Sequence, residues 1–329
     1  MKRFFAGFCA LFLLLLLTPA LAFTNGQAPL IGQQEELNGS YYLVKNAQTG
    51  EVMKLSPLDY IKGVVAAEMP LSYHTEALKA QAVAAHSYAL YRINQKLNSS
   101  SGSGEAYLST DPAECQGYLD LEGRKAQWGD QFDAYEAKLT EAVSAVIDKI
   151  LVSGGEPVMA MFHAVSGGRT EDAANLFGSS VSYLVPADSA GDELSPSFLA
   201  EKTFTTAQMK EALLPLLNGA SLSDSPADWF GAPERSDSGT VLSVAVGGVS
   251  VKGTDLRDAL SLASANFTVT LSDDTFTVIT RGRGHGVGMS QYGAVGFASE
   301  EGWSYAQILT HYYSLKPSSK YKLVKPVWD

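Results

Sequence analysis

The sequence Arg281-Gly-Arg-Gly-His-Gly-Val-Gly-Met-Ser-Gln-Tyr-Gly-Ala294 sets five glycines around a single histidine, His285. Glycine lets the backbone turn where other side chains would clash, and it lets the backbone approach a ligand closely. The stretch follows a strand-like run at 275–280 and precedes a helix-like one, which is a common place for a binding site. Its spacing fits neither a dinucleotide fingerprint nor a phosphate loop. We therefore expect a functional loop here, with a tight structural turn capped by the histidine as the alternative.

The composition of the whole chain limits what can surround this loop. Its 329 residues are enough for one large domain or two modest ones. A hydrophobic content of 46% and a charged content of 18% allow a real core. The net charge of -11 argues against nucleic acid or an anionic membrane surface as the main partner. The net charge does not argue against a neutral polymer, such as a glycan, as the partner.

Residues 1–23 have the features of an export segment. Two basic residues precede an apolar run from 4 to 17, and Ala20-Leu-Ala22 resembles a cleavage site. The apolar stretch is also just long enough to span a bilayer, so a cleaved signal and a retained anchor are both open. In either case the rest of the chain lies outside the cytoplasm. Cys115 is then the single cysteine of the mature part, which leaves no disulfide within it.

The remaining chain divides into a polar linker at 24–39, a folded region at 40–320 and a basic tail at 321–329. Helices are expected at 57–69, 75–97, 135–149, 206–217, 254–262 and 304–312, and hairpin turns at 46–50, 154–155, 247–248 and 272–274. Helices come early and strands come late, without regular alternation. This pattern predicts an α+β fold in which early alanine-rich helices pack on mixed or antiparallel sheets and loops form the functional groove.

Glu68 lies in the last turn of the first predicted helix, which starts at Ser56-Pro57 and stops at Pro70. A carboxylate at that end meets the negative pole of the helix macrodipole, and its apolar neighbours add desolvation. Both effects raise the pKa of the carboxyl group, so that it stays protonated nearer neutral pH, as a general acid requires. The alternative is a solvated glutamate that simply ends an amphipathic helix.

Two further segments carry polar side chains that are candidates for binding substrate. Gln81 and Tyr88 share one face of the alanine-rich helix at 75–97, because they are seven residues apart. Ser166-Gly-Gly-Arg-Thr170 forms a third candidate loop after a predicted strand. For the glutamine and tyrosine residues, a packing role is the alternative to a substrate contact.

Taken together, these segments resemble the stage II sporulation protein D family. The matching pieces, in order along the chain, are Val64–Pro70, Glu76–Ala85 with Tyr88-Ala89, Ser166–Thr170, Tyr183-Leu184, Gly284–Ala294 and His311–Tyr313. The resemblance covers residues 40–320, and it makes this folded region the expected catalytic region. Any one of these motifs alone would be weak, whereas the full set in this order is specific.

The resemblance implies a lytic transglycosylase that cleaves the MurNAc–GlcNAc bond of peptidoglycan during engulfment of the forespore, with Glu68 as the catalytic residue. It implies glycan strands stripped of stem peptides as substrate, and a cell-wall amidase and engulfment membrane proteins as partners. It also implies a retained anchor on the mother-cell side, in place of secretion after cleavage at Ala22. Because relatives include amidase enhancers, a non-catalytic glycan-binding enhancer is the alternative.

A lytic reaction can use one carboxyl group, whereas hydrolysis normally needs two. No second carboxylate motif is evident around Glu68, although Asp172 and Asp188 stay open as candidates. A neutral hydrogen-bonding groove would suit a sugar polymer better than a charged one. The residues expected to line it are Gln81, Tyr88, Ser166, Thr170, His285, Ser290, Gln291 and Tyr292. For His285 we expect bracing or orienting ahead of direct proton transfer.

The sequence departs from the family pattern in two places. His86-Ser87 stands where the family commonly has an Arg-Thr pair. The segment around Cys115 has one cysteine and no histidine, where some members bind zinc through two of each, so we expect no metal and no cofactor. A metal-dependent hydrolase using His163, His285 and His311 is disfavoured, because these residues lie on separate segments without close pairing.

Overall fold

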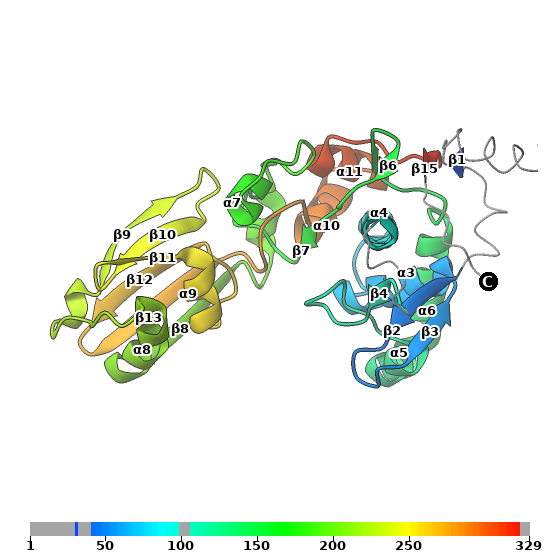
Figure 1. Ribbon diagram of the computed structural model, residues 1–329. Coiled ribbons are helices and arrows are strands. Elements are labelled where there is room, and N and C mark those ends of the chain that lie inside the picture. Colours follow the sequence, from blue (N-terminus) through cyan, green and yellow to red (C-terminus); the bar gives the residue numbers. More distant parts are fainter. Residues whose placement is uncertain (1–29, 32–40, 99–105, 323–329) are drawn as a thin grey trace, which may run out of the picture.

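The computed structural model describes residues 30–31, 41–98 and 106–322, which form an α+β fold (Figure 1). The predicted export segment lies outside these residues, as do most of the linker and of the basic tail. No helix within the described ranges is long and apolar enough to cross a membrane. Buried hydrophobic side chains gather in two cores, one in a helical lobe and one in a strand lobe.

The first helix, α3 (Pro57–Glu68), begins and ends as predicted. The Ser56 side chain accepts a hydrogen bond from the Asp59 backbone N–H, and Pro57 fills the first turn. Met69 is the C-cap that ends the helix, just before Pro70. Glu68 is therefore its last residue, as the sequence indicates.

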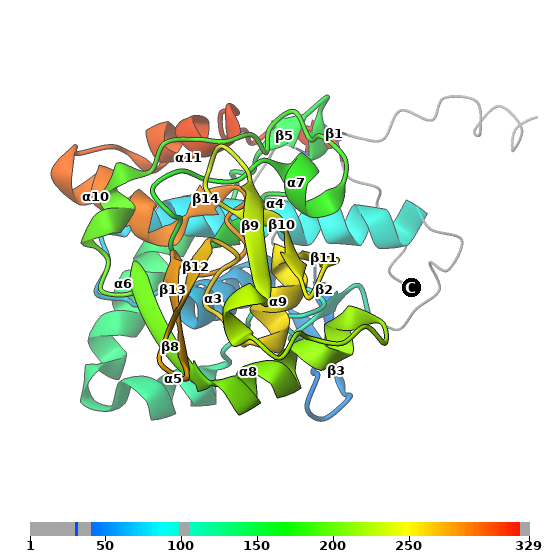
Figure 2. The ribbon, with the colours of Figure 1, turned by 90° about the vertical axis from the view of Figure 1, so that its left-hand side faces the viewer.

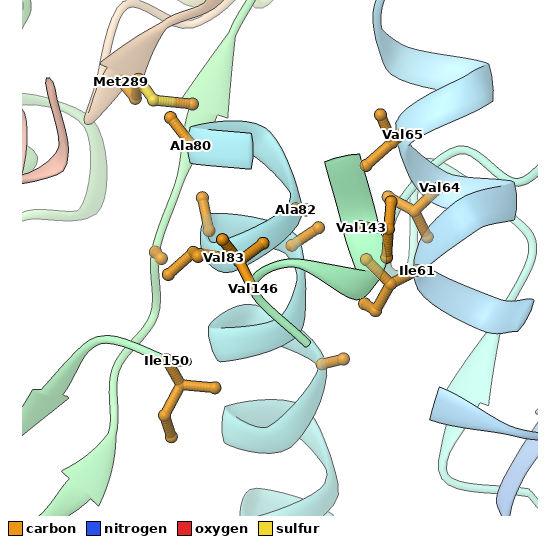
Figure 3. Close-up of a cluster of buried hydrophobic side chains, with 14 of the residues drawn as sticks. Ile61, Val64, Val65, Ala80, Ala82, Val83, Val143, Val146, Ile150 and Met289 are labelled. Carbon is orange, nitrogen blue, oxygen red and sulfur yellow. The ribbon is translucent and has the colours of Figure 1, made fainter. Parts of the chain in front are cut away.

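The long helix α4 (Thr75–Asn98) is the centre of the helical lobe. It packs against α3, α6 (Phe132–Ser144), α10 (Gln291–Glu300) and α11 (Tyr305–Tyr313). Its alanines permit these approaches from several sides, because a small side chain lets another element come close. Figure 3 shows Ala80 and Ala82 lying between Met289 on one side and the valines of α3 on the other. The early helices thus pack largely on other helices, and less on sheets than predicted.

Small sheets and short helices complete the helical lobe. Strands β2 (Tyr42–Lys45) and β3 (Val52–Leu55) form the hairpin expected around the turn at 46–50, and β4 (Leu108–Ser109) lies parallel to β2. The remaining elements are α5 (Leu121–Trp128), the 3-10 helix Gly129–Gln131, the β5 (Val152–Ser153) and β6 (Glu156–Pro157) hairpin, and the β1 (Leu30–Ile31) and β15 (Tyr321–Lys322) pair. The last pair joins the linker to the start of the tail.

The strand lobe holds two antiparallel three-stranded sheets (Figure 1). One has the order β12 (Phe267–Ser272), β13 (Thr275–Arg281), β8 (Leu199–Thr205), and the other β11 (Val249–Lys252), β10 (Val241–Val246), β9 (Phe230–Arg235). Helices α8 (Thr206–Leu213) and α9 (Gly253–Ala259) pack on them, with 3-10 turns at Leu214–Leu217 and Pro226–Asp228. Both hairpins predicted in this region are confirmed, whereas β8 and β9 were not expected.

Several predicted boundaries were wrong, among them the following three. Helix α9 starts at Gly253, one residue before the predicted start at 254. Gly253 packs so tightly on Val241 that a Cβ there would lie 1.9 Å from the Val241 carbonyl oxygen. Helix α6 ends at Ser144, five residues before the predicted end at 149. The predicted hairpin strand was expected to run on to residue 163, but it ends at Pro157, because Phe162 and His163 pair with another strand.

That other pairing brings the two glycine-rich loops together. Strand β7 (Phe162–His163) runs parallel to β14 (Met289–Ser290). Single bridges then join Val165 to Arg283 and Glu171 to Val287, so the turn at 166–170 lies beside the loop at 281–288. The short helix α7 (Ala173–Phe177) and the 3-10 helix Ala190–Leu194 follow this junction between the lobes.

Candidate active site

Glu68 is partly buried at the end of α3, and two groups from distant segments hold its carboxyl group. The Gly117 backbone N–H donates to Glu68 Oε1 over 2.9 Å, and the Gln291 side chain also forms a hydrogen bond with it. Burial raises the pKa of the Glu68 carboxyl above its ordinary value, and the two hydrogen bonds offset part of that rise. The predicted direction of the pKa shift is therefore confirmed.

The segment 115–119 lies along α3 and carries Gly117 to the acid. The Leu119 backbone N–H donates to the Gly63 carbonyl oxygen, and the Tyr118 ring covers Gly63 so closely that a Cβ there would meet it at 2.1 Å. Cys115 is a free, partly buried thiol, as expected. Glycines at 63 and 117 thus let two backbones meet beside Glu68.

Gln81 and Gln291 form a buried pair behind the acid. Gln291 Nε2 lies 3.4 Å from Gln81 Oε1, and Gln291 in turn contacts Glu68. Gln81 is 0% exposed and Gln291 is 5% exposed. Both were predicted to bind substrate, but in this arrangement they orient the carboxyl group. Their contact with glycan stays a prediction that their burial does not favour.

A cleft of about 910 Å³ lies between the two lobes, with Glu68 on its helical wall. The other lining residues are Pro112, Ala164, Ala200, Glu201, Lys202, Arg257, Ser261, Leu262, Ala263, Val278, Thr280, Arg283 and Gly284. Figure 2, seen from the strand lobe, shows β8 and β13 lying in front of α3. The groove is therefore lined by strands as well as loops, and it is charged, whereas a neutral groove was predicted.

The glycines of the loop at 281–288 are required by close packing against the turn it faces. Gly282 has a φ of +75°, and a Cβ there would lie 2.7 Å from the Val165 carbonyl oxygen. A Cβ on Gly288 would lie 2.1 Å from the Met161 carbonyl oxygen. This packing presents Arg283 and Gly284 to the cleft, while His285 lines an adjoining pocket of about 350 Å³.

His285 braces the loop. Its Nδ1 accepts a hydrogen bond from the Val287 backbone N–H over 3.1 Å, and its ring also bonds to the backbone of Phe162. The rings of His285 and His163 lie 5.6 Å apart. Burial, reinforced by the Arg257 charge, lowers the pKa of His285 to about 4. The imidazole is thus neutral at neutral pH, which favours bracing over proton donation.

The hydroxyl groups predicted to bind glycan are engaged inside the protein. Ser166 Oγ donates to Asp192 Oδ2 over 2.5 Å, and Ser290 Oγ donates to Asp192 Oδ1 over 2.7 Å. Thr170 Oγ1 accepts from the Ala187 backbone N–H over 2.8 Å. All three side chains are buried, so we expect them to support the loops. No motif in the sequence indicates Asp192, whose pKa burial raises.

The two predicted stacking tyrosines lie outside the cleft lining. Tyr88 Oη accepts a hydrogen bond from Arg92 over 3.1 Å, and the Arg92 guanidinium also lies over the Tyr88 ring. Tyr292 Oη donates to the Leu194 carbonyl oxygen over 3.2 Å, and its ring packs edge-on against Tyr73. Both remain partly exposed, so a contact with a longer strand stays a prediction.

The carboxylates proposed from sequence as a second catalytic group have other tasks. Asp172 caps α7 through the Ala174 backbone N–H, and Asp188 pairs with Arg169 at the surface. Neither lines the cleft. The carboxylate that shares it with Glu68 is Glu201 of β8, which the sequence did not indicate because no motif surrounds it.

The histidines do not gather into a metal centre. His311 Nε2 contacts the Asp188 carbonyl oxygen over 2.7 Å, apart from the pair formed by His163 and His285. Across the described ranges, no three His, Cys, Asp or Glu side chains lie close enough to hold a metal ion. His86 is buried on α4, and its Nε2 lies 2.8 Å from Tyr42 Oη. That the protein works without zinc stays a prediction.

Comparison with known proteins bears on this arrangement. A family model described as Stage II sporulation protein matches residues 45–152. The chain is 35% identical over 337 residues to stage II sporulation protein D of Bacillus subtilis (strain 168), covering 95% of this chain and 94% of that protein. It is 36% identical over 256 residues to the protein of the same name from Bacillus amyloliquefaciens, covering 78% of this chain and 72% of that protein.

A more distant relative has a different name. The amidase enhancer of Bacillus subtilis (strain 168) is 26% identical over 304 residues, which cover 77% of this chain and 39% of that protein. The match to the first relative extends over nearly the whole of both chains. The chain therefore belongs to the stage II sporulation protein D family, a family of sporulation proteins.

Proposed function

We propose that this protein is a lytic transglycosylase that cleaves the MurNAc–GlcNAc bond of peptide-free peptidoglycan strands, with Glu68 as both acid and base. The observation that supports it most directly is the placement of Glu68. Its carboxyl group has a raised pKa, is fixed by Gly117 and Gln291, and opens on a cleft between two lobes. An oriented carboxyl group with a raised pKa beside a groove is suited to proton donation.

The reaction can proceed with this single carboxyl group. Protonated Glu68 gives its proton to the glycosidic oxygen, and the bond from that oxygen to C1 of the muramic acid breaks. The C6 hydroxyl of the same sugar bonds to C1, and its proton passes to the Glu68 carboxylate. The products are a 1,6-anhydro end and a new hydroxyl end, and the acid is restored without water.

Location and partners belong to the same proposal. We expect the chain to act outside the cytoplasm, held by its N-terminal segment and working with engulfment membrane proteins. Substrate free of stem peptides requires an amidase that removes them, and the relative named amidase enhancer supports a link to such an enzyme. That name also favours a second candidate function, a glycan-binding enhancer without catalysis of its own.

Mass spectrometry of peptide-free glycan strands tests the two functions. The strands are incubated with residues 26–329, with the Glu68→Gln variant and with Glu201→Gln as a matched control from the same cleft. We expect 1,6-anhydro ends from the parent and from the control, and none from Glu68→Gln. Glutamine keeps the shape and the carbonyl acceptor, so that variant should still fold and bind glycan. Cleavage by Glu68→Gln at the parental rate would reject the catalytic assignment, and binding without cleavage by any form would favour the enhancer.

A further inference from the structure

We propose that Arg257 and Arg283 form a carboxylate-binding site in the cleft, which recognises the free lactyl group of N-acetylmuramic acid. The proposal rests on the proposed function, because it identifies what the cleft selects in a glycan strand. It assigns specificity to Arg257 of the strand lobe and to Arg283 of the loop at 281–288, which line the same cleft as Glu68.

The first observation is the local charge of that wall. The chain as a whole has 35 acidic and 24 basic residues. The strand-lobe side of the cleft nevertheless carries Lys202, Arg257 and Arg283 against Glu201 alone. Lys202 Nζ is already used, because it donates to the carbonyl oxygens of Leu260 and Ser261 at the end of α9. The two guanidinium groups are therefore the donors that face the cleft.

The second observation is that these donors lack partners. Within the part of the chain that the structure describes, neither Arg257 nor Arg283 forms an ion pair or a side-chain hydrogen bond. Arg257 Nε is moreover buried without any acceptor. By contrast, Arg124 and Arg235 both donate to protein oxygens. The other N–H groups of the two guanidiniums are not buried and have no protein acceptor among the described residues, so an oxygen atom of a ligand in the cleft can accept from them.

The fold holds both arginines in place. Arg283 exchanges two backbone hydrogen bonds with Val165, of 2.7 Å and 3.1 Å, between two glycines that allow the close approach. Arg257 lies on α9, whose start is fixed by the tight contact of Gly253 with Val241. Arg257 lines both the cleft and the adjoining pocket, so it lies where the two hollows meet. These constraints fix the backbone at both positions.

The chemistry of the strand identifies the ligand. A guanidinium group binds a carboxylate through two parallel hydrogen bonds, and it binds a neutral amide less well. In peptidoglycan the lactyl group of muramic acid is an amide while the stem peptide is attached. Hydrolysis of that amide leaves a carboxylate on an otherwise neutral glycan. A cleft that binds this carboxylate beside Glu68 would therefore act after an amidase, and the two arginines would enforce that order.

The test measures binding by the Glu68→Gln protein, which separates recognition from cleavage. Isothermal titration uses a peptide-free oligomer of N-acetylglucosamine and N-acetylmuramic acid, and the same oligomer with its lactyl carboxylates converted to primary amides. We expect the carboxylate form to bind about tenfold more tightly, the size of one charge-assisted contact. Arg257→Gln and Arg283→Gln should each remove most of that preference and leave the affinity for the amide form unchanged.

Controls keep the result interpretable. Lys210→Gln removes an exposed positive charge on α8 outside the cleft, and it should leave the preference intact. Arg283→Lys keeps the charge but loses the paired N–H donors of the guanidinium, so it should recover only part of the preference for the carboxylate form. Thermal unfolding of each variant shows whether it folds, and Arg283 is the safer position because its side chain is exposed.

Two outcomes would overturn the inference. One is equal affinity of the parent for the carboxylate and amide oligomers, and the other is an equal loss for both oligomers in folded arginine variants. The proposed function fails separately. If the wild-type protein prefers the carboxylate oligomer but forms no anhydro ends, the arginine site stands and the lytic activity falls. If it cleaves both oligomers equally well, the lytic activity stands and the arginine site falls.

Discussion

Gly117→Ala should move the Glu68 carboxyl group, the proposed acid, without changing it chemically. The Gly117 N–H donates to Glu68 Oε1 at 2.9 Å, and a Cβ on Gly117 would stand 2.9 Å from the same oxygen. Ordinary contacts of a Cβ begin at 3.4 Å, so the carboxyl group must move by the difference, about 0.5 Å. Gly117 does not have a positive φ, so the backbone accepts alanine.

The size of the effect follows from this displacement. A hydrogen bond to a charged group is worth about 1.5–3 kcal/mol, and 1.36 kcal/mol corresponds to about one pKa unit. The Gly117 bond stabilises the charged form of Glu68, so weakening it raises the pKa of Glu68 further. In the proposed reaction Glu68 works protonated, so the rate falls as pH rises through its pKa. The alkaline limb of the pH–rate profile should therefore move to higher pH. Misplacement of the carboxyl group should also lower kcat about tenfold.

The assay is the pH profile of kcat/KM for release of 1,6-anhydro ends from peptide-free strands. Gly191→Ala is the control, because its Cβ would meet the Gly296 Cα at an ordinary 3.4 Å and lies outside the cleft lining. Thermal unfolding should be similar for both variants. An unchanged rate and limb in Gly117→Ala would refute the idea that this backbone N–H holds the acid. A lower rate with an unmoved limb would point to a different cause.

Three further changes test the surroundings of the acid. Gln291→Ala should lower kcat and shift the alkaline limb upward, because its hydrogen bond also lowers the pKa of Glu68; an unmoved pH profile would contradict this. Glu201→Gln should still yield 1,6-anhydro ends at close to the parental rate, and loss of all cleavage would indicate a reaction with two carboxyl groups. Asp192→Ala should lower the free energy of unfolding by about 3 kcal/mol, since it leaves buried hydroxyl donors unpaired, and denaturant titration would show it.

Elements with local signals could be predicted from the sequence. The Ser56-Pro57 start of α3 and the turn at 46–50 depend on residues close in the chain, and both are confirmed. Strand β9 gave no such signal, because five of its six residues are exposed and it does not alternate. It forms a strand because β10 supplies its partner. That contact comes from the tertiary fold, and no local pattern in the sequence indicates it.

The residues of the candidate site also fall into those with a local sequence signal and those without one. Glu68 could be found because a carboxylate at the end of an apolar helix is locally unusual. Its partners Gly117 and Gln291 could not, since they come from positions 49 and 223 residues further along the chain. The serines of the two loops were misleading for a different reason. A hydroxyl group that binds a sugar and one that binds a buried carboxylate have the same sequence signature, and only Asp192 distinguishes them.

The charge of the cleft shows why a net charge describes a binding site poorly. The value of -11 sums over the whole surface, whereas screening at physiological salt limits each charge to about 8 Å. The net charge therefore repels a strand with free carboxylates mainly at low salt, whereas in the proposed site Arg257 and Arg283 attract it at contact. Added salt should weaken the repulsion, which raises the association rate. It should also weaken the contact with the arginines, which raises the dissociation rate. An acidic protein can therefore select an anionic polymer, provided that its few unpaired arginines lie where the polymer must enter.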